Sequence, residues 1–154
     1  MMAVTHVALG AVAGIGWAAL AEGALLPAVV ASIAGSLLPD IDHPKSWLGR
    51  RLPFVSWPLA AVVGHRGITH SLLATVACLA LLWEAGHTAV AAPAALGYLS
   101  HLAADWCTHG GVPLLWPSLK HYHAPVTVRT GSIADLSLAA VLWLGAGWYL
   151  AVPH

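Results

Sequence analysis

The sequence predicts an all-α integral membrane protein, a bundle of about five short transmembrane helices. Of its 154 residues, 59% are hydrophobic and only 8% are charged, whereas an ordinary soluble domain carries about 25% charged residues. Six Lys and Arg and six Asp and Glu residues are too few to cover the surface of a soluble protein of this size. The composition therefore excludes a soluble enzyme, and the length is that of one membrane-embedded domain covering residues 1–154.

Five charge-free runs have the length of a membrane-spanning helix, which needs about 20 residues within a range of about 17–25. These runs are 1–21, 23–39, 67–83, 85–104 and 136–154. A sixth run, 52–65, is too short to span a membrane and contains Pro53 and Pro58. We expect it to form an interfacial or re-entrant segment.

The distribution of charge predicts the orientation of the chain. With five spans, all six Lys and Arg residues lie on the side that receives the N-terminus and the two long segments 40–66 and 105–135, whereas Glu22 and Glu84 lie on the other side. Because basic residues accumulate in cytoplasmic loops, the first side is expected to be cytoplasmic.

Histidine and aspartate residues gather on this basic side, at the ends of all five predicted helices. They are His6, Asp40, Asp42, His65, His70, His101, Asp105 and Asp135. Neutral imidazole and carboxylate groups are the ligands of zinc and related divalent ions. His101 and Asp105 are one helical turn apart on one face, and Gly97, one turn earlier, leaves room for a neighbouring element. We predict that all of these residues except Asp135 bind one or two divalent ions, with zinc expected.

Arginine residues beside this cluster favour an anionic substrate. Arg66 and Arg129 are close to it in the predicted topology, and guanidinium pairs bidentately with phosphate oxygens. Two-metal sites commonly hydrolyse phosphoesters, with a carboxylate such as Asp42 or Asp135 as general base. The sequence therefore predicts a metal-dependent hydrolase that cleaves a phosphoester of a phospholipid or a lipid-linked phosphate.

Several alternatives remain open at this stage. The same ligands would suit a divalent-metal transporter or sensor, although transport sites usually lie near the membrane midplane. Four more histidines are either ligands or merely hydrogen-bonded or solvated residues: His43, His109, His121 and His123. The formal net charge of zero argues against a nucleic acid partner, and the oligomeric state is undetermined.

Three motifs resemble those of the bacterial inner-membrane-bound, metal-dependent hydrolases of the YdjM type. They are LPDIDHPKS at 38–46, GHRGITHS at 64–71 and GYLSHLAAD at 97–105. The resemblance extends from His6 to about Asp135. It implies a multi-pass protein of the bacterial inner (cytoplasmic) membrane and a hydrolytic reaction class, without naming a substrate.

The order of the ligands is also similar, more weakly, to that of the helical zinc-dependent phospholipases C. Those enzymes carry a late His-x-x-x-Glu pair, whereas here Gly131 stands four residues before Asp135.

Overall fold

The computed structural model describes residues 1–64 and 66–152, and in them the chain is helical as predicted. The elements are α1 (Ala3–Leu20), α2 (Leu25–Leu37), the 3-10 helix η1 (Leu38–Asp42), α3 (Pro53–Val63), the 3-10 helix η2 (Ile68–His70), α4 (Leu72–Glu84), α5 (Thr88–Trp106) and α6 (Ile133–Ala151). Among the described residues, three helical stretches are long and apolar enough to cross a membrane: α1, α2 continued by η1, and α6, while α3 and α4 are shorter apolar helices. The prediction of an all-α membrane protein is confirmed.

Two of the predicted segments take a more specific form than expected. The run 52–65 contains the 11-residue helix α3. The run 67–83 is divided, because Ile68–His70 form a separate 3-10 turn and Ser71 caps α4 by accepting a hydrogen bond from the backbone N–H of Ala74 at 3.2 Å. The run 67–83 is therefore not one continuous helix.

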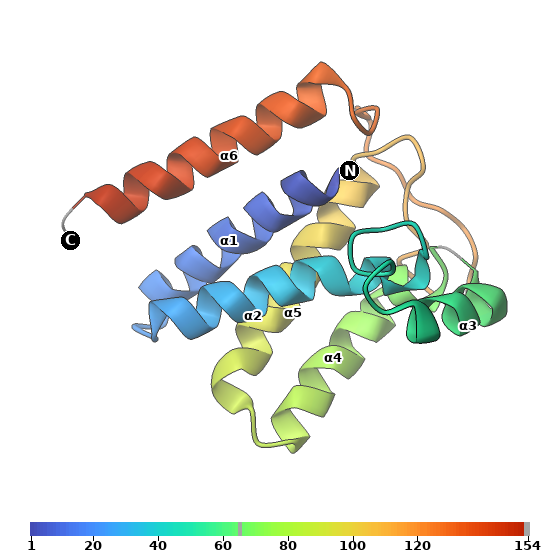
Figure 1. Cartoon of the computed structure of the whole chain (residues 1–154), viewed down its shortest axis with the longest axis horizontal. Helices are drawn as coiled ribbons and strands as arrows, with labels where there is room; N and C mark the ends of the chain where they lie inside the picture. Colours follow the sequence, from blue (N-terminus) through green and yellow to red (C-terminus); the bar gives the residue numbers. More distant parts are fainter. Residues whose placement is uncertain (65, 153–154) are drawn as a thin grey trace.

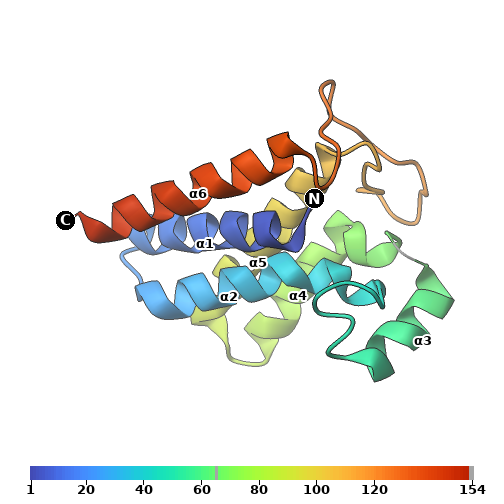
Figure 2. The same ribbon diagram turned by 45° about the horizontal axis from the view of Figure 1, so that its top comes forward.

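Helices α1, α2 and α5 form the centre of the bundle. α1 and α2 are antiparallel neighbours, and α5 packs against both of them (Figure 1). α4 packs on α5, and α6 lies along α1, as Figure 2 also shows from a second direction. The arrangement brings the start of α1 and the ends of α2 and α5 together.

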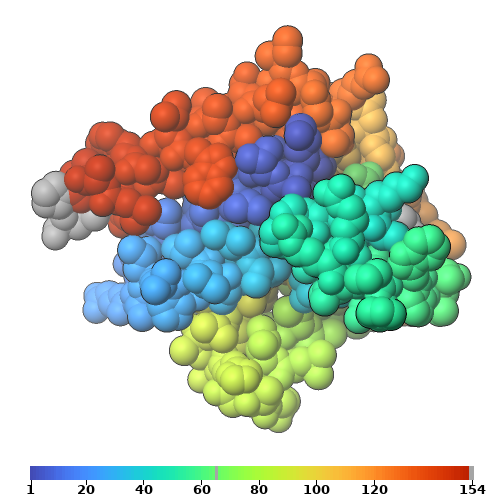
Figure 3. All heavy atoms as spheres, in the orientation of Figure 1, coloured from blue at the N-terminus to red at the C-terminus, as the bar shows by residue number. Residues whose placement is uncertain are grey.

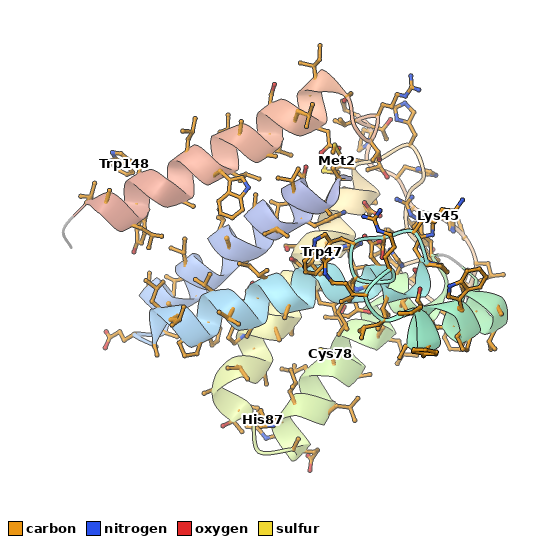
Figure 4. All side chains as sticks on the ribbon, viewed as in Figure 1. Met2, Lys45, Trp47, Cys78, His87 and Trp148 are labelled. Atoms are coloured by element: carbon orange, nitrogen blue, oxygen red, sulfur yellow. The ribbon has the colours of Figure 1, made fainter. Side chains whose placement is uncertain are left out.

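Small residues fill the interior, and large apolar side chains face outwards. The buried core is dominated by alanine, including Ala8, Ala11, Ala28, Ala91 and Ala94. Large exposed residues include Leu26, Leu81, Leu144 and Trp148, the last of which is labelled in Figure 4. Because hydrocarbon solvates such side chains well, this inside-out pattern is typical of helices that pack in lipid through small residues.

Two glycines allow the backbones of α2 and α5 to touch. A Cβ atom on Gly97 would lie 1.8 Å from the carbonyl oxygen of Ser32, and one on Gly35 would lie 2.0 Å from that of Ala94. No side chain fits at either position, so the expectation that Gly97 makes room for a neighbour is confirmed.

The two ends of the bundle differ in character. One end carries the short turns after α1 and between α4 and α5, the second of which includes His87, labelled in Figure 4. At the other end lie η1, η2 and the long segment between α5 and α6, near the labelled Met2 and Lys45. The polar motifs of the sequence therefore share one end.

Candidate metal centre

Side chains from four elements meet at this end of the bundle. α1 supplies His6, η1 supplies Asp40, η2 supplies His70, and α5 supplies His101 and Asp105. Two overlapping sets of three have ligand atoms that all lie within 4.8 Å of one another: His6, Asp40 and His101, and His70, His101 and Asp105. All of these side chains are buried except that of Asp40, which is 21% exposed. We call these five residues the metal centre.

Two imidazole nitrogens face each other across the metal centre. The Nε2 atoms of His70 and His101 are 3.3 Å apart. His101 Nδ1 lies 2.7 Å from the carbonyl oxygen of Ser36, which can only accept, so Nδ1 carries the proton and Nε2 of the neutral ring carries a lone pair. Two nitrogens bound tetrahedrally to one zinc ion, at about 2.0–2.1 Å, are separated by about 3.3 Å. The spacing of the two rings therefore fits a shared metal ion.

Carboxylate oxygens lie around this pair of nitrogens. Oδ1 of Asp40 is 3.7 Å from Nε2 of His70 and 3.9 Å from Nε2 of His101. Oδ2 of Asp105 is 3.8 Å from Nε2 of His101. Mixed nitrogen and oxygen donors of this kind suit zinc and similar divalent ions.

His6 completes the other side of the centre. Its ring stacks on that of His101 with centroids 3.8 Å apart and planes inclined by 14°. Its Nε2 lies 3.4 Å from Oδ1 of Asp105, and its buried Nδ1 has no hydrogen-bond partner among the described residues. An unpaired buried polar atom costs about 1–3 kcal/mol, which a metal ligand would avoid.

Thr69 fixes the orientation of His70. The threonine hydroxyl donates to Oδ2 of Asp42, so it must accept from Nδ1 of His70, which lies 3.1 Å away. Nδ1 of His70 is also 3.3 Å from the same carboxylate oxygen. The hydroxyl of Tyr98 in turn donates to the carbonyl oxygen of Thr69. Asp42, predicted as a ligand or base, thus lies on the Nδ1 side of the His70 ring and is not part of either donor set.

The environment of His70 favours positive charge. Burial alone would lower its pKa, but hydrogen bonds to the carboxylates of Asp40 and Asp42 outweigh burial and raise the pKa above its ordinary value. The two carboxylates that favour this charge would also attract a metal cation.

Arg66 joins two of the predicted carboxylates. Its guanidinium donates to Oδ2 of Asp105 at 2.6 Å and to the carbonyl oxygen of Gly111 at 3.0 Å. Its backbone N–H donates to Oδ2 of Asp42 at 3.0 Å, in a left-handed conformation with φ of 61°. Asp105 also accepts from the amino group of Met1. Arg66 therefore lies beside the metal centre, as the sequence predicts.

Asp135 and Arg129 are not brought into the metal centre. Both oxygens of the buried Asp135 carboxylate are engaged, with Thr5 Oγ1 at 2.6 Å, the backbone N–H of Gly131 at 2.9 Å and that of Met2 at 3.1 Å. These contacts tie the start of α6 to the start of α1, and Asp135 belongs to neither donor set. Arg129 lies exposed in the segment before α6.

The remaining predicted histidines are placed as follows. His65 lies outside the described residues. His109, His121 and His123 are exposed, and His121 Nδ1 pairs with the carbonyl oxygen of Gly110 at 3.1 Å. His43 lines the pocket described next.

A polar pocket of about 410 Å3 opens beside the metal centre. Asp40, Asp105 and Arg66 line it on the side of the centre, and Lys45 and Arg50 line it from the loop after η1. Lys45 and Arg50 were not predicted as site residues, although they follow Asp40 by only a few positions in the sequence. The pocket thus combines metal ligands with three basic side chains.

The chain is similar to known inner membrane proteins. The family model described as YdjM inner membrane protein matches residues 1–152. The chain is 42% identical over 142 residues to inner membrane protein YdjM of Escherichia coli (strain K12) and to that of Shigella flexneri, covering 88% of this chain and 71% of each relative. It is 34% identical over 116 residues to uncharacterized protein YvsG of Bacillus subtilis (strain 168), covering 75% of this chain and 72% of that protein. No solved structure matches the chain significantly. The chain belongs to the YdjM family of inner membrane proteins.

Proposed function

We propose that this inner membrane protein is a metal-dependent hydrolase that cleaves a phosphoester of a phospholipid or lipid-linked phosphate. The observation that carries the proposal is the pair of Nε2 atoms, 3.3 Å apart between buried carboxylates, beside a pocket with three basic side chains. His6, Asp40, His70, His101 and Asp105 would hold one or two divalent ions, with zinc expected. A bound ion of this kind supplies Lewis-acid activation of water and neutralises charge on a phosphate.

Basic residues of the pocket would bind the phosphate. Arg66, Lys45 and Arg50 offer donors to its oxygens, and charge-assisted bonds from such donors are stronger than neutral ones. Asp40 is the metal-centre carboxylate with 21% exposure and it lines the pocket, so it is placed to accept a proton from the attacking water. The water oxygen would bond to phosphorus as the ester P–O bond breaks, and the departing alkoxide would take up the proton that Asp40 accepted, so that it leaves as the alcohol.

The site is proposed to face the cytoplasm. Lys45, Arg50, Arg66 and Lys120 all belong to segments at the same end of the bundle as the metal centre, whereas Glu22 and Glu84 flank the turns at the other end. This asymmetry follows the positive-inside rule.

A divalent-metal transporter or sensor is less well supported. Fixed positive charge beside the metal centre, from Arg66 above all, would oppose entry of a metal cation. The donors also lie at one end of the helices, where a transport site is usually near their middle.

Hydrolysis by purified protein tests the proposal directly. Zinc-loaded wild type should release phosphate or alcohol from dioleoyl phosphatidic acid, phosphatidylglycerol or bis(p-nitrophenyl) phosphate, and His101→Gln should lose this activity together with its metal. His87→Gln, at the other end of the bundle, is the matched control. Zinc-loaded wild type that hydrolyses none of these substrates, yet moves zinc into proteoliposomes, would overturn the proposal in favour of a transporter.

A further inference from the structure

An apolar groove of about 550 Å3 runs between α2, α4 and α5. It is lined by Ala34 of α2 and by Ala77, Cys78 and Leu81 of α4. The side chains of Ala34, Ala77 and Leu81 are exposed. Figure 3 shows the start of α5 and α4 next to α2 on one face of the molecule, and Figure 4 labels Cys78 on the side of α4 towards α2. In a membrane protein such a groove is open to lipid.

One end of the groove adjoins the metal centre. Leu38, which lines it, is the first residue of η1 and stands two residues before Asp40. Tyr98, which also lines it, donates its hydroxyl proton to the carbonyl oxygen of Thr69, the residue that orients His70. The other end is bounded by Leu82 near the α4–α5 turn. The groove thus extends along α4 towards the far end of the bundle.

A second apolar groove offers a comparison. It has a volume of about 370 Å3 and lies between α1 and α6, lined by residues such as Ala19 and Val141. None of its lining residues belongs to the metal centre, to η1 or to η2. Of these two grooves, the one along α4 includes a residue of η1, the element that carries Asp40, and the one between α1 and α6 does not.

The polar pocket lies on the other side of the same ligands. Asp40 and Asp105 line the polar pocket, while Leu38 and Tyr98 line the groove. The metal centre is consequently bordered by an apolar surface in one direction and by basic side chains in the other. A molecule that binds to both surfaces would have a hydrocarbon part and an anionic part.

We propose that the groove along α4 binds one hydrocarbon chain of the substrate while its phosphoester lies at the metal centre. The position of the phosphoester at the metal centre rests on the proposed function, whereas binding of a hydrocarbon chain in the groove does not. A longer chain makes more van der Waals contacts along the apolar wall, so the protein should prefer long-chain to short-chain phosphoesters. Ala34 and Ala77 leave the width that the chain needs.

Protection of Cys78 tests occupancy without any assay of activity. In a Cys107→Ser background, the rate of Cys78 alkylation by N-ethylmaleimide is followed by mass spectrometry with hexadecyl phosphate or butyl phosphate present. Hexadecyl phosphate should slow alkylation by about tenfold or more, and butyl phosphate should have little effect, because only the long chain fills the groove. The control is Val76→Cys with Cys78→Ala, which is exposed on α4 but does not line the groove.

Filling the groove tests its role in hydrolysis. Ala77→Trp should lower kcat/KM for hexadecyl phosphate by about tenfold or more and leave that for butyl phosphate unchanged, since the short ester does not use the groove. Ala19→Trp, the same substitution in the second groove, should change neither value.

The outcomes separate the inference from the proposed function. Cys78 protection without hydrolysis of either ester supports the groove and contradicts the hydrolase. Hydrolysis of both esters with no chain-length effect and no protection contradicts the groove. Equal protection of Cys78 and Val76→Cys would also overturn the inference, because bulk lipid would then cover both positions. Protection that needs no added ester and rises with protein concentration would overturn it too, because the occupant of the groove would then be a second copy of the chain.

Discussion

The imidazole rings of His70 and His101 approach each other with Nε2 atoms 3.3 Å apart, while both Nδ1 atoms are held by other partners. Ser36 holds one ring through its carbonyl oxygen, and Thr69 holds the other through its hydroxyl. Each partner directs a lone pair towards the opposing ring. In the neutral rings both lone pairs would be available to a cation bound between them, so the arrangement predicts how individual variants behave.

His101→Gln should remove most of the bound metal. Nε2 of His101 belongs to both donor sets, so its loss disrupts both together. Elemental analysis should find about one to two divalent ions per wild-type chain and few in the variant. His87→Gln should retain the wild-type content, and full retention by His101→Gln would remove His101 from the centre.

Thr69→Val should weaken metal binding while the fold is kept. Valine has nearly the shape of threonine but cannot accept from Nδ1 of His70 or donate to Asp42. Loss of a group that orients a ligand typically costs about 10–100-fold in metal affinity. Chelator competition measures the change, and Thr69→Ser should restore affinity. An unchanged affinity in Thr69→Val would show that the hydroxyl does not orient His70.

Arg66→Ala should separate metal binding from hydrolysis. Its positive charge beside Asp105 opposes a bound cation, so the variant should keep its metal. Removal of one donor to a developing phosphate charge costs on the order of a hundred- to a thousandfold in rate. Activity and metal content are measured on the same sample, with Lys120→Ala as an exposed control. Unchanged turnover would indicate that Arg66 only sets orientation in the membrane.

Gly97→Ala should destabilise the bundle. Its Cβ atom would lie 1.8 Å from the carbonyl oxygen of Ser32, so α2 and α5 must separate. Overpacking of this kind costs on the order of 1–3 kcal/mol or more. Thermal unfolding in detergent reports the loss. Gly145→Ala, where an added Cβ meets nothing within 4 Å, should unfold like wild type.

Cysteine labelling should establish the orientation. In a background with Cys78→Ala and Cys107→Ser, Lys45→Cys should react only with reagent that enters the cytoplasm, and His87→Cys should react from outside. Labelling of Lys45→Cys from outside would reverse the proposed orientation.

Much of the fold was predictable from hydropathy and charge alone. The charge-free runs locate the helices because a membrane requires long apolar stretches, and the clustering of His and Asp at helix ends follows from the same topology. The spacing of His101 and Asp105 was also readable, since residues four apart share a helical face.

Side-chain direction in the irregular turns was not predictable. Asp40 and Asp42 are two residues apart, but the 3-10 geometry of η1 directs only Asp40 to both His70 and His101. The place of Asp135 in the first turn of α6 could have been predicted, because Ser132 and Asp135 have the spacing of a capping box. Ser132 Oγ indeed accepts from the backbone N–H of Asp135 at 3.4 Å.

The contact between α2 and α5 sets the dimensions of the metal centre. Gly35 and Gly97 place the two backbones against each other five residues before Asp40 and four before His101. The distance between the ligands on these two elements is therefore set by contacts between main-chain atoms, which are the same in every sequence. Exposed apolar side chains such as Leu26 and Leu144 can then exchange for other apolar residues without shifting a donor atom. Such a centre can be preserved while most of the surface around it diverges to suit membranes of different lipid composition.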